Sequence, residues 1–194
     1  MHDVEQAADA IRSGRLVVYP TETVYGLGAD ALDEAAIERV FAAKRRVREE
    51  PISLAVPTVD RAFEYVDATD RESTFMREFL PGPVTVVVAK RAAVPDVLTG
   101  GRQRVGVRVP DHDLARSLLH AAAPITATSA NVSGNPSVTA PDDLDPAIRS
   151  AAAVVLDGGE TAGTASTVVD VSADEVLREG RDADAVRAWL TDHR

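Results

Sequence analysis

The chain has 194 residues, 45% of them hydrophobic, and a formal net charge of −10. This length is typical of one domain with a sizeable core, and we expect residues 1–194 to form a single domain. The sequence has no cysteine, which excludes a disulfide framework, a thiolate nucleophile and a cysteine-based zinc site. The acidic balance argues against non-specific nucleic-acid binding as the main function, because such binding needs a basic surface.

The N-terminal residues include Asp3 and Glu5 and show no basic segment followed by an apolar core, so no signal peptide is predicted. No apolar run approaches the ~20 residues that span a bilayer. These features predict a cytoplasmic protein without membrane attachment. Lys44 and Lys90 are the only lysines. An acidic, lysine-poor composition suits the salt-rich cytoplasm of a halophile, and a genomic bias toward arginine codons is the alternative explanation.

The first third of the chain alternates between predicted helices and a strand. An amphipathic helix is predicted in residues 4–11, with Gly14 as its C-cap. The apolar run 16–19 is typical of a buried strand. A second helix follows, with Asp30 or Asp33 as its N-cap, and its last turn carries basic side chains that complement the helix dipole.

The same alternation continues to the end of the chain. Further strands are predicted at 52–56, 84–89, 104–109, 125–128, 154–156, 167–171 and 175–177, and further helices at 60–65, 70–79, 113–122 and 184–190. Residues 131–145 are rich in Gly, Pro, Ser and Asp and predict a long loop. Intermixed helices and strands favour an α/β sheet protein.

The stretch Pro20–Asp30 places threonine hydroxyls, a carboxylate and a phenol between the first strand and the second helix. Its glycines permit a tight turn or a close approach, and a helix N-terminus nearby favours an anionic ligand. An ordinary strand-to-helix connection is the simpler interpretation. A dinucleotide-binding fingerprint fits poorly, because six residues separate the strand from Gly26.

The strand 104–109 alternates strictly between valines and other residues. Val105, Val107 and Val109 should therefore pack to one side, with Arg104, Gly106 and Arg108 on the other. We expect the Arg108 guanidinium to be available to a ligand rather than committed to the core.

Pro20–Gly28 resembles the opening motif of the YrdC-like threonylcarbamoyl-AMP synthase family. Further motifs resemble that family in the same order, namely Lys44-Arg45-Arg46, Pro81-Gly82-Pro83-x-Thr85, Arg104–Pro110, Thr128–Asn131 with Ser133-Gly134, Ser166–Val168 and Leu177–Gly180. Each motif is weak alone, and their joint appearance over most of the chain is specific. The length resembles that of the single-domain members.

The resemblance implies a twisted open mixed sheet with flanking helices and a concave ligand-binding face. It also implies that L-threonine, bicarbonate or CO2, and ATP give threonylcarbamoyl-AMP and pyrophosphate. That product serves the threonylcarbamoyl modification of adenosine in tRNA, through a downstream transferase. Mg²⁺ on the phosphates is expected by the same analogy. No enzyme nucleophile is needed, which agrees with the absence of cysteine.

The resemblance also assigns residues to the two substrates. Threonine is expected to bind at Thr23, Arg108, Ala127 and Ser166. ATP is expected to bind at Lys44, Arg46, Glu50, Arg104, Ser129, Asn131, Ser137 and Arg178, of which Lys44, Arg46, Ser129 and Asn131 are the catalytic candidates. Each could instead be structural: Lys44 as a dipole-complementing charge, Arg108 as a strand residue, and Ser129–Asn131 as a loop cap.

Several positions depart from the family pattern. Glu50 stands in place of a common asparagine, Arg104 in place of a threonine, and Ala55 in place of a histidine near threonine. Glu50 beside phosphate would be repulsive unless Arg104 or Mg²⁺ compensates. Two other functions remain open, a relative that forms a carbamoyl-adenylate from carbamoyl phosphate and a module that binds double-stranded RNA or tRNA directly.

Overall fold

The computed structural model describes residues 2–193. Its α-helices are α1 (His2–Arg12), α2 (Glu34–Lys44), α3 (Val59–Ala62), α4 (Asp70–Phe79), α5 (Asp96–Thr99), α6 (Asp113–Ala122), α7 (Pro146–Ala151) and α8 (Ala183–Asp192). Its strands are β1 (Leu16–Tyr19), β2 (Gly26–Gly28), β3 (Ser53–Ala55), β4 (Val66–Asp67), β5 (Val84–Lys90), β6 (Arg104–Arg108), β7 (Ile125–Ser129), β8 (Ala152–Val155), β9 (Thr167–Asp170) and β10 (Glu175–Arg178). A 3₁₀ turn at Pro141–Asp143 interrupts the long loop that the sequence predicts after Asn131. Within the described range, no helix has the length and apolarity needed to cross a bilayer.

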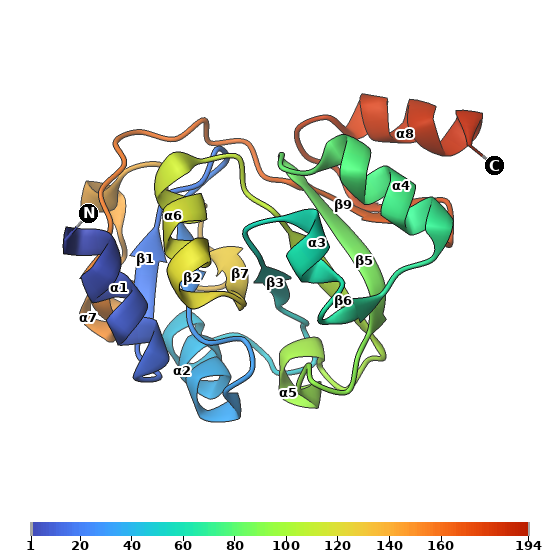
Figure 1. Cartoon of the computed structure of the whole chain (residues 1–194). Helices are drawn as coiled ribbons and strands as arrows, with labels where there is room; N and C mark the ends of the chain where they lie inside the picture. Colours follow the sequence, from blue (N-terminus) through green and yellow to red (C-terminus); the bar gives the residue numbers. More distant parts are fainter. Residues whose placement is uncertain (1, 194) are drawn as a thin grey trace.

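The strands form one mixed, twisted sheet, which confirms the predicted fold class (Figure 1). Their order is β10-β9-β5-β6-β3-β7-β2-β1-β8, and β4 pairs with β5. Three of the pairings, β1–β8, β3–β6 and β5–β9, are parallel, and the others are antiparallel. Sequentially distant segments therefore lie side by side, which brings motifs from across the chain onto one surface.

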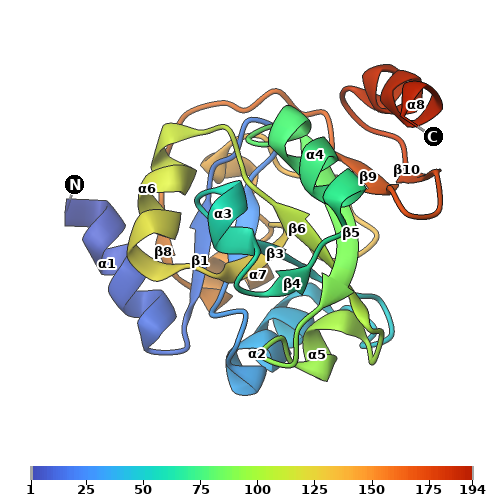
Figure 2. The same cartoon turned by 45° about the vertical axis from the view of Figure 1, so that its right-hand side comes forward.

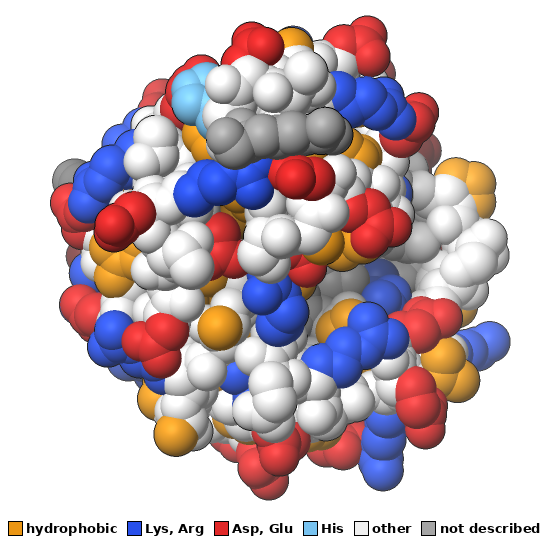
Figure 3. All heavy atoms as spheres, turned by 90° about the vertical axis from the view of Figure 1, so that its right-hand side faces the viewer, with side chains coloured by type: hydrophobic (Ala, Val, Ile, Leu, Met, Phe, Trp, Pro, Cys, Tyr) orange, Lys and Arg blue, Asp and Glu red, His pale blue; other side chains and the backbone are white. Residues whose placement is uncertain are grey.

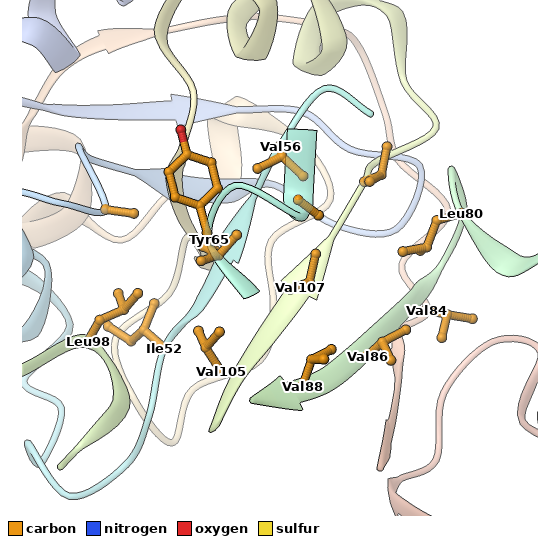
Figure 4. Close-up of a cluster of buried hydrophobic side chains, with 14 of the residues drawn as sticks. Ile52, Val56, Tyr65, Leu80, Val84, Val86, Val88, Leu98, Val105 and Val107 are labelled. Atoms are coloured by element: carbon orange, nitrogen blue, oxygen red, sulfur yellow. The ribbon is translucent and has the colours of Figure 1, made fainter. Parts of the chain in front are cut away.

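The two faces of the sheet are packed differently. One face carries the larger core, in which the valines of β5 and β6 pack together with side chains from the neighbouring helices and loops (Figure 4). Val105 and Val107 lie on this side, as their alternation predicts. On the other face, α1 and α6 cover β1 and the start of β7, at the left of Figure 1. Beyond these two helices, the same face forms the wall of a cavity.

Gly26 and Gly28 belong to a strand, and of the two roles that the sequence suggests, a tight turn or a close approach, the structure shows the close approach. Strand β2 lies between β1 and β7. A Cβ atom on Gly26 would come within 2.8 Å of the Tyr19 ring, and one on Gly28 within 3.1 Å. The glycines are therefore required because the aromatic ring lies directly over the neighbouring strand. The short helices α5 and α7 are likewise absent from the sequence prediction, although Asp145 caps α7 and Pro146 begins it.

The residues after β10 contact two parts of the fold, helix α4 and the segment that leads into β9. Helix α8 packs beside α4 (Figure 2), where Trp189 makes an edge contact with Phe75 and donates a hydrogen bond to Glu78. After β10 the chain passes closely against Ser166, and Arg181 donates its backbone N–H to Ala165 at 2.9 Å. A Cβ atom on Gly180 would overlap the backbone of Ala165 and Ser166.

Gly180→Ala is expected to lower the free energy of unfolding by about 1–3 kcal/mol, because the methyl group meets backbone atoms that cannot rotate away. Thermal melting of the purified variant measures this effect. Ser150→Ala, at the exposed end of α7, is the control and should leave the melting temperature unchanged. A Gly180→Ala protein that melts like the control would contradict the close approach at this position.

Candidate active site

A cavity of about 640 Å³ occupies the part of the sheet face that α1 and α6 leave uncovered. This volume is in the range of small-molecule sites. Its wall is built by β2, β3, β5, β6, β7, β9 and β10, together with the segment that follows β1. The face seen in Figure 3 is hollowed, with Lys and Arg side chains in and around the hollow. Five arginines and a single carboxylate line the cavity, namely Arg46, Arg102, Arg104, Arg108, Arg178 and Asp170.

Strand register determines which side chains meet on the cavity floor. Val87 of β5 is opposite Gly106 of β6, and Ser53 of β3 lies on the other side of that glycine. A Cβ atom on Gly106 would overlap the Ser53 hydroxyl. The absence of a side chain at Gly106 therefore leaves space on the cavity floor between Arg104 and Arg108.

Arg108 lines the cavity, on the face opposite the valines of β6, and its guanidinium is paired with Glu22, which the sequence did not predict. It is only 6% exposed. Its Nη2 donates to Glu22 Oε1 at 2.6 Å and to Thr23 Oγ1 at 3.3 Å. Within residues 2–193, Arg108 Nε and Glu22 Oε2 are buried and have no hydrogen-bond partner. The ion pair thus leaves one buried donor and one buried acceptor unsatisfied.

Arg178 and Ser166 form a second polar group on the wall. The Arg178 guanidinium donates to the Ser166 carbonyl and, at 2.9 Å, to its hydroxyl. The Ser166 hydroxyl also lies 3.2 Å from Thr85 Oγ1. Burial lowers the pKa of Arg178, and the nearby charges of Arg108 and Arg46 lower it further. The mutual repulsion of these three cations favours an anionic ligand between them.

Arg46 lies where α2 gives way to the following loop. Its Nε and Nη2 donate to the Glu50 and Pro51 carbonyls, both at 3.1 Å. The Glu50 carboxylate is 3.5 Å from Arg46 Nη1 and is half-exposed. Arg46, rather than Arg104, is therefore the arginine that compensates the Glu50 charge in this structure.

Arg104 is bound instead to two acidic side chains at another part of the wall. Its Nη2 donates to Glu72 at 3.1 Å, to Asp170 at 2.9 Å and to the Val87 carbonyl at 2.6 Å. Glu72 is buried, and it also forms the capping box of α4 with Thr69. Two carboxylates around one guanidinium leave this region without excess positive charge.

Lys44 is buried beneath the Ser129–Asn131 segment. It is 1% exposed, and its Nζ donates to the carbonyls of Ser129 and Asn131. Burial, reinforced by the Arg46 charge, lowers the pKa of Lys44 to about 8. The Asn131 amide in turn donates to the Val132 and Asn135 carbonyls. Lys44 and Asn131 thus fix the backbone that presents Ser129 to the cavity.

The structure brings most of the candidate residues together on the cavity wall. Those that line it are Thr23, Arg46, Arg104, Arg108, Ala127, Ser129, Ser137, Ser166 and Arg178. The lining does not include Lys44, Glu50 or Asn131, which act on neighbours of the wall. Ala55 is fully buried and also lies outside the lining.

Sequence reasoning did not predict the roles of three further residues. Tyr19 and Asp170 line the cavity, and Glu22 binds Arg108 behind it. A carboxylate between two threonines is a signal for Glu22, but nothing local connects Asp170 with Arg104. Among the described residues, no cluster of three or more His, Cys, Asp or Glu side chains could hold a metal ion.

Comparison with known proteins agrees with this architecture. The model of the family Sua5_yciO_yrdC, described as telomere recombination, matches residues 9–180. Threonylcarbamoyl-AMP synthase of Pyrococcus abyssi is 41% identical over 169 residues, which cover 86% of this chain and 50% of that protein. Threonylcarbamoyl-AMP synthase of Photobacterium profundum is 32% identical over 186 residues, which cover 93% of this chain and 100% of that protein.

A crystal structure of P. abyssi Sua5 complexed with L-threonine superposes with a TM-score of 0.84 at 38% identity. The match covers 94% of this chain and 56% of that one, so the chain spans about half the length of the P. abyssi relative. The family match extends over most of the chain and includes every strand that lines the cavity. The chain therefore belongs to the Sua5/YciO/YrdC family.

Proposed function

We propose that the protein is an L-threonylcarbamoyladenylate synthase, a nucleotidyltransferase that forms threonylcarbamoyl-AMP and pyrophosphate from L-threonine, bicarbonate or CO2, and ATP. The observation that carries the proposal is the arginine-lined cavity, in which Arg46, Arg108 and Arg178 surround a space of about 640 Å³. Relatives named for this activity match most of the chain, and one is covered along its whole length.

The chemistry requires positioning and charge neutralisation rather than a protein nucleophile. The threonine amine adds to CO2 and loses a proton, which gives a carbamate. A carbamate oxygen then attacks the α-phosphorus of ATP, and the bond to the β-phosphate oxygen breaks to release pyrophosphate. Fixed cations around the phosphates stabilise the charge that moves onto the leaving group.

In the proposed complex, threonine binds at Thr23, Arg108, Ala127 and Ser166. The place of Arg108 on the cavity wall supports this assignment, because Glu22 and Thr23 engage only its Nη2 and the guanidinium has further donors for a carboxylate. The hydroxyls of Thr23 and Ser166 lie on the same wall and provide neutral hydrogen bonds.

ATP is assigned to the remaining polar groups. Arg46 and Arg178 provide the cationic contacts to the phosphates, with Ser129 and Ser137 as hydroxyl donors on the wall. Lys44 and Asn131 act by holding the Ser129 backbone, and Glu50 modulates Arg46. Because Arg104 is already neutralised by Glu72 and Asp170, we assign it to the nucleoside end rather than to the phosphates.

Mg²⁺ remains part of the proposal. Asp170 is the one carboxylate among the lining residues and is bound to Arg104. Such a wall fits an ion held by phosphate oxygens and water rather than by a protein cage, the usual mode of Mg²⁺ on nucleotides. When bound there, the ion would neutralise phosphate charge.

The product is a labile adenylate, and we propose that a downstream threonylcarbamoyl transferase uses it to modify tRNA, in the cytoplasm. All the strands that line the cavity belong to one sheet, which supports the proposal that residues 1–194 act as one domain.

Incubation with ATP, threonine and bicarbonate tests the reaction directly. Pyrophosphate release should require both threonine and bicarbonate, and an AMP-containing product should appear by chromatography. Turnover with carbamoyl phosphate in place of threonine and bicarbonate would instead indicate the carbamoyl-adenylate reaction. Binding of RNA without any turnover would contradict an enzymatic function.

Arg108→Lys is expected to weaken threonine binding about 10- to 150-fold. The lysine keeps a positive charge for Glu22 but cannot serve two acceptors in the fork geometry of arginine, a loss of ~1.5–3 kcal/mol. ATP affinity should change little. Calorimetric titration with each ligand measures both effects, and a loss confined to ATP would mean that the two subsites are reversed. Arg108→Ala is less informative, because it leaves the buried Glu22 charge uncompensated and destabilises the fold.

Lys44→Met should weaken ATP binding at pH 7 and make it less dependent on pH. In the wild type, a pKa of about 8 means that Lys44 loses its positive charge as the pH rises from 7 to 9. ATP affinity should therefore fall several-fold over this range, because attraction to the phosphates is lost. The methionine variant has no such charge and leaves two carbonyls without their donor. Titrations at several pH values compare the two proteins, and parallel profiles would exclude an effect of the Lys44 charge.

A further inference from the structure

The cavity contains three guanidinium groups that influence one another, but they are not equally compensated. Arg108 is in contact with a buried carboxylate, Glu22, at 2.6 Å, and the two side chains are 8% and 13% exposed. Arg46 has a half-exposed partner at 3.5 Å, and for Arg178 no ion pair is found among residues 2–193. Arg108 is thus the member of the group whose charge is cancelled from within the protein.

If the protein has the proposed function, on which this inference rests, its cavity must direct two different anions to two different positions. One is a triphosphate with several negative charges, and the other is an amino-acid carboxylate with one. Coulomb energy grows with the product of the charges, so an uncompensated guanidinium would favour the triphosphate. A fixed carboxylate beside the guanidinium repels the triphosphate several times more strongly than it repels a single carboxylate.

The geometry of the pair permits this discrimination without blocking the arginine. Glu22 accepts from Nη2 through Oε1, and within residues 2–193 no hydrogen bond engages the Nη1 group of the same guanidinium. Arg108 lines the cavity, whereas Glu22 is not among the lining residues and lies behind it. A ligand can therefore receive a hydrogen bond from Arg108 while it experiences the opposing charge of Glu22.

We propose that Glu22 is a specificity-determining residue, which reserves Arg108 for the singly charged carboxylate of the amino acid and excludes the polyphosphate from that position. Arg46 and Arg178, which lack a buried acidic partner, then form the polyphosphate position. The two substrates are kept in separate parts of one continuous arginine-lined wall.

Glu22→Gln tests this role, since the amide keeps an oxygen for Arg108 Nη2 and removes the negative charge. Inorganic tripolyphosphate is the probe, titrated by calorimetry with and without saturating threonine. In the wild type, tripolyphosphate should compete with ATP and leave threonine affinity unchanged. In Glu22→Gln, tripolyphosphate should bind roughly tenfold more tightly or better and should also compete with threonine.

Glu64→Gln is the matched control, because Glu64 forms an ion pair of the same 2.6 Å length with Arg61 at an exposed position outside the cavity. It should behave as the wild type does. Glu22→Asp keeps the negative charge and shortens the side chain. It should still exclude tripolyphosphate from the threonine position, and this variant remains informative if Glu22→Gln folds poorly. Thermal melting verifies that each variant is folded.

Unchanged tripolyphosphate affinity and no competition with threonine in Glu22→Gln would overturn the sorting role while leaving the proposed function intact. Competition that appears equally in Glu22→Asp would overturn it as well, because the charge would then be irrelevant. A wild-type protein that binds tripolyphosphate but not threonine would overturn the proposed function itself, and with it the sorting of these two ligands.

Discussion

The ion pair between Glu22 and Arg108 is the contact on which the candidate site depends. It joins the segment after β1 to strand β6, although the two residues are 86 positions apart. Transfer of two charges from water to a buried position has a high desolvation cost, and only close geometry with further hydrogen bonds offsets it. Here the pair has one short hydrogen bond, a longer one to Thr23 and two unpartnered atoms. A pair that is incompletely satisfied without a ligand is more consistent with recognition than with stability alone.

Three glycines allow the backbone around the site to approach neighbouring groups more closely than a residue with a side chain would permit. Gly26 lies beneath the Tyr19 ring, Gly106 beside Ser53, and Gly180 against the backbone of Ser166. Each glycine is adjacent to a residue that lines the cavity or belongs to its wall. Their common property is the absence of Cβ at a crowded position, and none of the three requires an unusual backbone conformation.

The electrostatic character of the cavity differs from that of the whole chain. The net charge is −10, yet the lining contains five arginines and one carboxylate. Many acidic residues form largely exposed ion pairs with arginines, such as Asp60 with Arg77 and Asp67 with Arg91, and acidic side chains are spread over the face seen in Figure 3. Exposed pairs of this kind contribute little to stability. An acidic exterior with a cationic cavity confines anion binding to the cavity and disfavours general adhesion to nucleic acid.

The sequence by itself determined the elements with a clear period or a clear cap. The alternation of β6 placed Arg104, Gly106 and Arg108 on one face, and helix α6 was predicted with its observed limits, because both signals depend on residues that are neighbours along the chain. The family motifs indicated which residues would gather at the site, and most of them line one cavity. Only the tertiary structure decided how the charges are paired. Glu22 with Arg108, Asp170 with Arg104 and Lys44 with the Ser129 carbonyl join residues 66 to 86 positions apart. Such pairings follow from strand order and register, and no local pattern in the sequence carries that information.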